Sequence, residues 1–205
     1  MHPEALKPEN KKIFPKLSQF KNFYLGGGTS LALQIGHRIS VDFDFFSKKE
    51  IDKKLLNQVK QVFPNNEIKP TINNSDELTV FVDDIKITFL YYPFGVILKP
   101  IKYQNINLLR IEEIAASKAH TIGHRGTFKD YVDLYFIFSK KYCTLEKIIK
   151  LAKKKYGDEF NARLFLEQLI YLEDIKDTNI IFLKMKATKK QIQQFFEKEI
   201  TKIKL

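Results

Sequence analysis

Three consecutive glycines, Gly26-Gly27-Gly28, precede a pair of aspartates, Asp42 and Asp44, that flank a single phenylalanine. Glycines let backbone N–H groups approach a phosphate where a side chain would block them. Carboxylate oxygens suit Mg²⁺, which binds one or two carboxylates together with substrate phosphates. In this order and at this distance, the two groups predict phosphoryl chemistry, and nucleotidyl transfer in particular.

The glycine run lies between a short strand expected at residues 23–25 and an apolar helix expected at residues 29–36. Thr29 or Ser30 is expected to cap that helix, and Gly36 suits its C-terminus. Free N–H groups and the dipole at a helix N-terminus attract anions. A tight turn that binds nothing is the alternative. The candidate nucleotide-binding residues are Gly27, Gly28, Thr29 and Ser30.

Residues 41–46 alternate between apolar and acidic side chains, as a strand does. Phe43 and Phe45 would enter a core, while Asp42 and Asp44 project together on the opposite face. Two like charges on one face repel each other unless a cation lies between them. Asp42 and Asp44 are therefore the candidate catalytic metal ligands. They would hold one Mg²⁺, or two ions about 3.5–4 Å apart that stabilise the attacking and leaving oxygens. A solvated strand face is the alternative.

Two blocks of the chain resemble the AbiEii/AbiGii toxin family, a branch of the polymerase-β-like nucleotidyltransferase superfamily. The first covers residues 24–33 and 36–47, and the second covers residues 114–118 and 125–135. The resemblance implies Mg²⁺-dependent transfer of a nucleoside monophosphate from an NTP, within a toxin–antitoxin or abortive-infection pair. It implies RNA, in particular tRNA, as the acceptor and an antitoxin protein as a partner.

Lys118 lies at helical spacing with Ile114 and Ile122 on an apolar stripe. A buried lysine is costly unless an anion meets it, and a triphosphate or a carboxylate would serve. Otherwise its long stem extends to solvent. The resemblance favours contact between Lys118 and a phosphate group of the nucleotide, as a catalytic and nucleotide-binding residue.

Asp130 has two interpretations. With Thr127 it fits a capping box that opens a helix. Asp133 follows one turn later on the same face, where pairing with Lys118 or Arg125 is expected. The resemblance assigns Asp130 to the active site, where it would orient Lys118 or serve as a general base.

Polymerase-like enzymes usually carry a third carboxylate on a later strand, and this chain departs from that pattern. Residues 78–82 and 85–90 predict a hairpin, with Asp83-Asp84 in a two-residue turn. Thr88 occupies the position expected to be acidic. Either Asp130 completes the site, or assistance by a general base is weak, or catalysis is impaired.

The composition is that of an ordinary globular protein, with 205 residues of which 44% are hydrophobic. No stretch reaches the roughly 20 apolar residues of a membrane-spanning helix. The chain starts with Met1-His2-Pro3-Glu4, which lacks the basic-then-apolar order of a signal peptide. The single cysteine, Cys143, excludes an internal disulfide and is interpreted as structural. These features predict a cytoplasmic protein without a membrane partner.

The net charge of +11 is unevenly distributed. Residues 1–100 carry 14 basic and 11 acidic side chains, whereas residues 101–205 carry 21 basic and 13 acidic ones. Lysines crowd residues 140–155 and 184–204, and could attract a polyanion through counterion release. Only four of the basic residues are arginines, a bias that an A/T-rich genome also produces. RNA binding is favoured over solvated helix faces because the proposed chemistry needs an acceptor.

The expected fold is α+β (α/β): a polymerase-β-like mixed sheet with flanking helices in a catalytic half, residues 1–109. An all-helical half, residues 110–205, follows and closes the nucleotide cleft. Strands are expected at 23–25, 41–46, 67–73, 78–83, 85–92 and 105–108. Helices are expected at 10–22, 29–36, 50–62, 110–123, 128–140, 144–156, 160–172 and 188–203, with Pro15 in the first turn of the opening helix or breaking it.

Three other functions remain open. The acceptor could be a small hydroxyl compound, such as an aminoglycoside, or a protein side chain. The chain could bind a nucleotide or RNA without turnover, a reading that Thr88 favours. It could also be a helical interaction protein with a vestigial cleft, whose main partner is an antitoxin.

Overall fold

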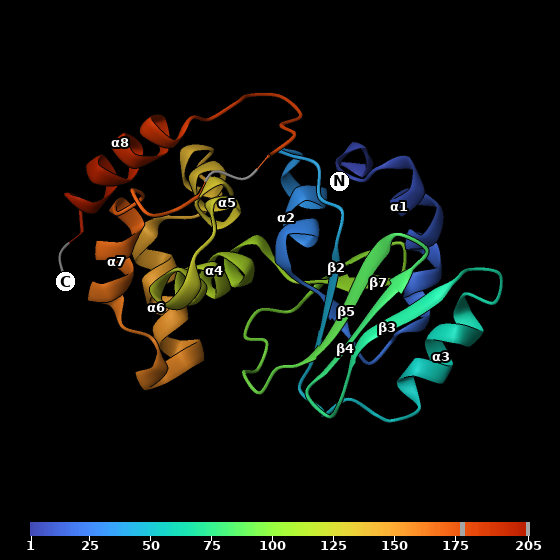
Figure 1. Ribbon diagram of the computed structural model, residues 1–205. Coiled ribbons are helices and arrows are strands. Elements are labelled where there is room, and N and C mark those ends of the chain that lie inside the picture. Colours follow the sequence, from blue (N-terminus) through green and yellow to red (C-terminus); the bar gives the residue numbers. More distant parts are fainter. Residues whose placement is uncertain (177–178, 204–205) are drawn as a thin grey trace. The chain divides into compact units, whose positions relative to one another are not determined.

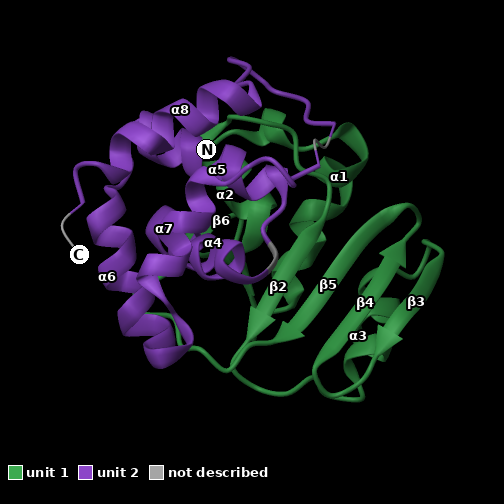
Figure 2. Cartoon of the chain, turned by 60° about the vertical axis from the view of Figure 1, so that its left-hand side comes forward, with its two compact units in different colours: residues 1–109 green, residues 110–205 purple. Residues whose placement is uncertain are grey.

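The computed structural model describes residues 1–176 and 179–203, apart from the side chain of Arg125. Lys204, in the second lysine cluster, lies outside these residues. The chain divides into two compact units, Met1–Leu109 and Arg110–Leu205, shown in green and purple in Figure 2. The roles expected of the two halves stay predictions, and each unit is described below by itself.

The first unit is built on a mixed sheet (Figure 1). Its strands are β1 (Tyr24–Leu25), β2 (Phe43–Ser47), β3 (Ile68–Asn73), β4 (Glu77–Val82), β5 (Ile85–Tyr91), β6 (Ile101–Tyr103) and β7 (Ile106–Leu108). Their order in the sheet is β3-β4-β5-β2-β1-β7-β6. The pairs β2/β5 and β1/β7 are parallel, and the other neighbours are antiparallel. The expected mixed sheet with flanking helices is confirmed.

One face of this sheet carries the core, as the alternation of residues 41–46 predicts. Phe43 and Phe45 are fully buried, and they belong to a single apolar cluster with Phe89 of β5. Helical segments supply the other side of the cluster. They are α1 (Pro8–Ile13), the 3-10 helix η2 (Phe14–Gln19) and α3 (Leu55–Val62). Side chains on the opposite face of β2 are thereby left for a functional site.

Three helices of this unit begin or end differently from the expectation, and one of them, α3, begins at Leu55 instead of residue 50. Pro15 stands at the start of η2, so the expected helix over residues 10–22 becomes a short α-helix followed by a 3-10 helix. The helix after the glycine run is α2 (Gly27–Ile35), which begins two residues early, with Gly26 as its N-cap. The short 3-10 helix η1 (Pro3–Ala5) precedes α1.

Two hairpins are closed by two-residue turns. The expected turn at Asp83-Asp84 is confirmed, since Val82 pairs with Ile85 and Asp83 has a positive φ of 52°. The hairpin of β6 and β7 was only half expected, because the sequence pattern gave no strand at residues 101–103. Its turn, Gln104-Asn105, has positive φ at both positions, 48° and 63°, as a tight hairpin turn requires.

The secondary-structure elements of the second unit, within its described residues, are all helices. The helices are α4 (Ile111–Arg125), α5 (Phe128–Ser139), α6 (Leu145–Tyr156), the 3-10 helix η3 (Gly157–Glu159), α7 (Ala162–Ile170) and α8 (Lys189–Ile200). Side-chain caps explain where three of them start: Thr144 before α6, Asn161 before α7 and Thr188 before α8. None of the helices in residues 1–176 and 179–203 has both the length and the apolar character needed to cross a bilayer.

A buried ion pair links α4 to α6. The ammonium of Lys155 lies 2.6 Å from the Glu113 carboxylate, and both side chains are completely buried. Lys155 therefore does not belong to the exposed lysine surface that the sequence suggested. That surface on α6 consists of Lys147, Lys150, Lys153 and Lys154.

Candidate active site

The glycine turn and Asp44 lie against each other. The N–H of Gly26 donates to the main-chain carbonyl oxygen of Asp44 at 2.9 Å. Gly27 has a φ of +60°, and a Cβ at this position would come within 2.6 Å of a carboxylate oxygen of Asp44. Only glycine combines that backbone conformation with that close approach. The structure therefore brings together two features that the sequence suggested separately.

Arg38 approaches the next glycine of the turn. A Cβ at Gly28 would lie only 2.3 Å from a guanidinium nitrogen of Arg38. This arginine is 4% exposed, and it donates to the main-chain carbonyl oxygen of Ile39 at 3.1 Å. The sequence reasoning missed Arg38 as a site residue. One signal was present: it is the single arginine among the first 100 residues of a lysine-rich chain.

Thr29 and Ser30 do not cap α2, because the helix begins before them and both side chains are buried. The Thr29 hydroxyl donates to the main-chain carbonyl oxygen of Asp42 and lies 2.8 Å from the Ser40 hydroxyl. Ser30 uses its N–H on the carbonyl oxygen of Gly26 at 3.3 Å. Thr29 thus fixes the chain at Asp42, and the contact of either residue with a nucleotide stays a prediction.

The two aspartates occupy the places that the alternation predicted. Asp44 lies within β2 and Asp42 immediately precedes it, and both are partly exposed while Phe43 between them is fully buried. Within the described ranges, no three His, Cys, Asp or Glu side chains gather into a metal-binding cluster. Two hard carboxylates nevertheless fit Mg²⁺, which usually keeps several waters and shares the substrate's phosphate oxygens.

Thr88 lies beside Asp44 in the sheet, at the position expected to hold a third carboxylate. The two residues are register partners on the parallel strands β2 and β5. On its other side Thr88 pairs with Thr79 of β4, and the two hydroxyl oxygens are 3.2 Å apart. The Thr79 hydroxyl donates to a carboxylate oxygen of Glu77 at 2.5 Å. Sequence reasoning did not single out Thr79 or Glu77.

A second cluster, in the helical unit, surrounds Lys118 of α4. Its ammonium lies 2.8 Å from Asp130 and 2.7 Å from Asp133, both on α5. Lys118 and Asp133 are both buried, so the stem of Lys118 does not extend to solvent. The other oxygen of Asp130 accepts from the N–H and the hydroxyl of Thr127 in a capping box. The expected pairing and the expected cap are both present, and Asp130 fulfils them together.

The surroundings of Asp130 favour its charged form. Burial opposes ionisation, but the nearby ammonium of Lys118, its hydrogen bond and the N–H of Thr127 outweigh it and lower the pKa of the Asp130 carboxyl. A carboxylate with a lowered pKa is a poor proton acceptor at neutral pH. The geometry thus supports Asp130 as a group that orients Lys118 rather than as a general base.

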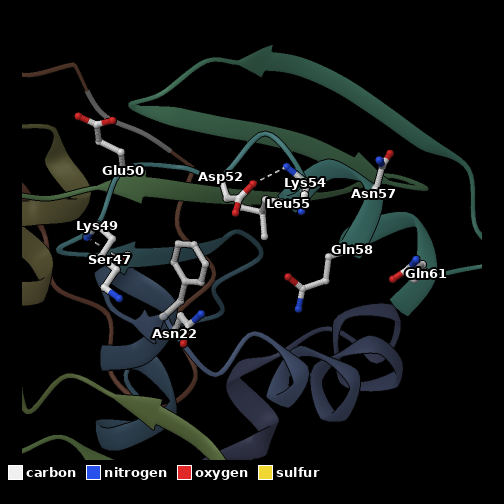
Figure 3. Close-up of a pocket in the computed structure, with 11 residues that line it drawn as sticks. Asn22, Ser47, Lys49, Glu50, Asp52, Lys54, Leu55, Asn57, Gln58 and Gln61 are labelled. Carbon is white, nitrogen blue, oxygen red and sulfur yellow. Dashed lines mark hydrogen bonds between the residues drawn. The ribbon is translucent and has the colours of Figure 1, made fainter.

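A cavity of about 660 Å³ in the first unit lies away from these residues, at the end of β2 where Ser47 stands. Figure 3 shows its polar lining, with Asn57, Gln58 and Gln61 contributed by α3. The N–H of Lys54 donates to Asp52 there at 2.8 Å. None of the candidate site residues lines this cavity.

Cys143 is a buried, free cysteine. Burial raises the pKa of its thiol, which disfavours the reactive thiolate. This agrees with the interpretation of Cys143 as structural.

The mixed sheet with flanking helices, and the aspartates beside a glycine turn, define a nucleotidyltransferase. Residues 12–202 match the family described as nucleotidyl transferase AbiEii toxin of type IV toxin–antitoxin systems, so the chain belongs to that family. The expectation from the two sequence blocks is confirmed.

Similar proteins span nearly the whole chain. The uncharacterized protein aq_aa25 of Aquifex aeolicus (strain VF5) is 28% identical over 200 residues, which are 95% of this chain and 96% of that protein. MenT4, the nucleotidyltransferase toxin Rv2826c from Mycobacterium tuberculosis H37Rv, has a TM-score of 0.59 and 16% identity, over 99% of this chain and 88% of that one. JHP933 from Helicobacter pylori has a TM-score of 0.53 and 16% identity, over 96% and 97%. These two structures support the fold.

Proposed function

We propose that this nucleotidyltransferase uses Mg²⁺ to transfer a nucleoside monophosphate from an NTP to a hydroxyl group of RNA, with tRNA as the first candidate. The observation that carries the proposal is the contact between Asp44 and the glycine turn at the N-terminus of α2. A helix N-terminus attracts phosphate, and a carboxylate beside it supplies a ligand for the metal that accompanies a triphosphate.

Asp42 and Asp44 would hold the metal, since both are partly exposed carboxylates at the start of one strand. The bound ion would neutralise phosphate charge and stabilise the attacking and leaving oxygens. Thr29 supports this arrangement because its hydroxyl holds the main chain at Asp42.

At the turn, Gly27 and Gly28 leave room for the Asp44 carboxylate and the Arg38 guanidinium, and the main-chain N–H groups of the two glycines would bind the triphosphate. Lys118, held by Asp130 and Asp133, is the candidate for contact with phosphate from the helical unit. Catalysis would depend on positioning and electrostatic stabilisation, without a covalent intermediate on the protein.

RNA is favoured as the acceptor by the charge distribution. Residues 101–205 carry 21 basic and 13 acidic side chains. Four lysines of α6 are exposed, namely Lys147, Lys150, Lys153 and Lys154. Such a surface attracts the phosphates of RNA whatever its sequence. Membership of a toxin–antitoxin family also supports an antitoxin protein as partner.

The test is transfer of label from each [α-³²P]NTP, with Mg²⁺, onto total bacterial RNA and protein. The double variant Asp42→Ala/Asp44→Ala should abolish labelling of an RNA band. Asp76→Ala/Asp84→Ala is the matched control, because it removes two exposed carboxylates of the same unit. Label on protein would identify a protein side chain, rather than RNA, as the acceptor. NTP binding without any transfer would favour a binding module that does not turn over.

A further inference from the structure

A row of polar side chains crosses three strands of the sheet and ends beside Asp44. Thr88 on β5 is the register partner of Asp44 on β2 and of Thr79 on β4. Register partners on neighbouring strands direct their side chains to the same face. Glu77 lies two residues before Thr79 and therefore shares this face, where Thr79 donates to it at 2.5 Å. The order across the sheet is thus Asp44, Thr88, Thr79 and Glu77.

The hydrogen-bond capacities of these groups fix the donor-to-acceptor direction along the row. A carboxylate only accepts, whereas a hydroxyl donates a single hydrogen and has two lone pairs. Because the hydrogen of Thr79 goes to Glu77, the 3.2 Å contact between the hydroxyls is made by Thr88 donating to Thr79. The lone pairs of the Thr88 oxygen are then left to accept a hydrogen on the side of Asp44. Both hydroxyls of the row thus donate in the direction of Glu77.

Burial of the two hydroxyls makes this arrangement unusual for a merely structural row. Thr79 and Thr88 are 3% and 5% exposed, whereas Glu77 is partly exposed. Valine has nearly the shape of threonine and is also enriched in strands, and β4 itself carries Val80 and Val82. The buried hydroxyls therefore add a polar path from the sheet face at Asp44 to a carboxylate that reaches solvent.

We propose that Thr88, Thr79 and Glu77 form a proton relay that removes the proton of the acceptor hydroxyl during transfer. The inference rests on the proposed function. The acceptor oxygen bonds to the α-phosphorus while the bond from that phosphorus to pyrophosphate breaks, and pyrophosphate leaves with the electron pair.

In the same step the acceptor's proton passes to the Thr88 oxygen, the Thr88 proton passes to Thr79, and the Thr79 proton passes to Glu77. Glu77 releases this proton to solvent, and the two hydroxyls rotate back to their starting positions. Thr88 is the group that contacts the acceptor, and Thr79 and Glu77 act through it. A threonine at position 88 thereby connects the site to a carboxylate two strands away.

The experiment measures single-turnover transfer from the [α-³²P]NTP that labels best onto total bacterial RNA, together with the KM for the NTP. Thr88→Val, Thr79→Val and Glu77→Gln should each lower the transfer rate about 10²-fold, the size of a general-base contribution. The KM should hardly change, because no relay group contacts the triphosphate. Thr88→Ser keeps the hydroxyl and should keep most of the rate.

Two further variants separate a relay from three independent contributions. Glu77→Gln/Thr79→Val should be no slower than either single variant, since one broken link already stops the relay. Asp84→Asn is the charge-matched control in the exposed turn between β4 and β5, and should transfer at the wild-type rate.

The outcomes distinguish the relay from the chemistry on which it rests. Wild-type rates in Thr88→Val and Glu77→Gln, with transfer abolished in Asp42→Ala/Asp44→Ala, would overturn the relay and leave nucleotidyl transfer standing. A wild-type protein that labels nothing would overturn both. If Thr88→Val unfolds, the decision passes to Glu77→Gln, because Glu77 is partly exposed and its replacement is tolerated more easily.

Discussion

Gly27→Ala tests the contact between the glycine turn and Asp44. The new Cβ would lie 2.6 Å from the Asp44 carboxylate oxygen, which must move by about 0.8 Å to reach ordinary contact at 3.4 Å. The positive φ of +60° adds a backbone cost of about 1–2 kcal/mol for an L-residue. Misplacement of a reacting group on this scale lowers rates by about 10²-fold.

Gly157→Ala is the matched control for backbone strain. Gly157 has a nearly identical φ of +57°, but a Cβ there would meet nothing within 4 Å. Both variants should lose about 1–3 kcal/mol of unfolding free energy, measured by urea denaturation. Only Gly27→Ala should lose label transfer.

Two results would refute the reasoning. Transfer by Gly27→Ala at the wild-type rate would mean that the position of Asp44 does not matter for the reaction. An equal loss of transfer in Gly157→Ala would mean that general destabilisation, rather than the displaced carboxylate, limits the rate.

Three further predictions concern the helical unit and RNA. Lys118→Met removes the cation from the fully buried Asp133 and should cost about 3–5 kcal/mol of unfolding free energy in urea, whereas a cost below about 1 kcal/mol would show that the ion pair contributes little. Because the pKa of Asp130 is lowered in the folded state, its stabilising contribution is present above the ordinary value of 3.8 and is lost as pH falls through the folded pKa. Urea titrations between about pH 2 and pH 6 should therefore show a shallower acid loss in Asp130→Asn. RNA binding, measured by filter retention, should weaken steeply between about 50 and 200 mM salt, and a flat dependence would argue against the lysine surface.

Local patterns were enough to predict the two halves of the candidate site, the glycine turn and the pair of aspartates. Alternation placed Phe43 in the core and its acidic neighbours on the opposite face, and the hairpin turn at Asp83-Asp84 set the register of β4 and β5. That register pairs Thr79 with Thr88, so this part of the relay was readable from the turn. The proximity of Asp44 to Thr88 could not be predicted from the turn, because it depends on the parallel pairing of β2 with β5.

Long-range packing explains the features that the sequence did not predict. Arg38 is buried against Gly28 only because the chain after α2 folds back onto the glycine turn. The sequence predicted a cap at Thr29 or Ser30, whereas α2 begins at Gly27 with Gly26 as its N-cap. Glycine has a low helix propensity, so propensity alone disfavours a helix start at these residues. The pairing of Lys118 with α5 was foreseen, because helical spacing already aligned Asp130 and Asp133 on one face.

The buried pair of Lys155 and Glu113 constrains how this sequence can diverge. An apolar pair of similar volume is often as stable as a buried ion pair, so an apolar α4–α6 contact is an accessible end point. The route to it is blocked, because replacing either residue first leaves a buried charge without its counterion at a cost of about 3–5 kcal/mol. That cost approaches the whole stability of a typical domain. Descendants of this chain should therefore keep both charges or lose both together, and a survey of close relatives should rarely find one without the other.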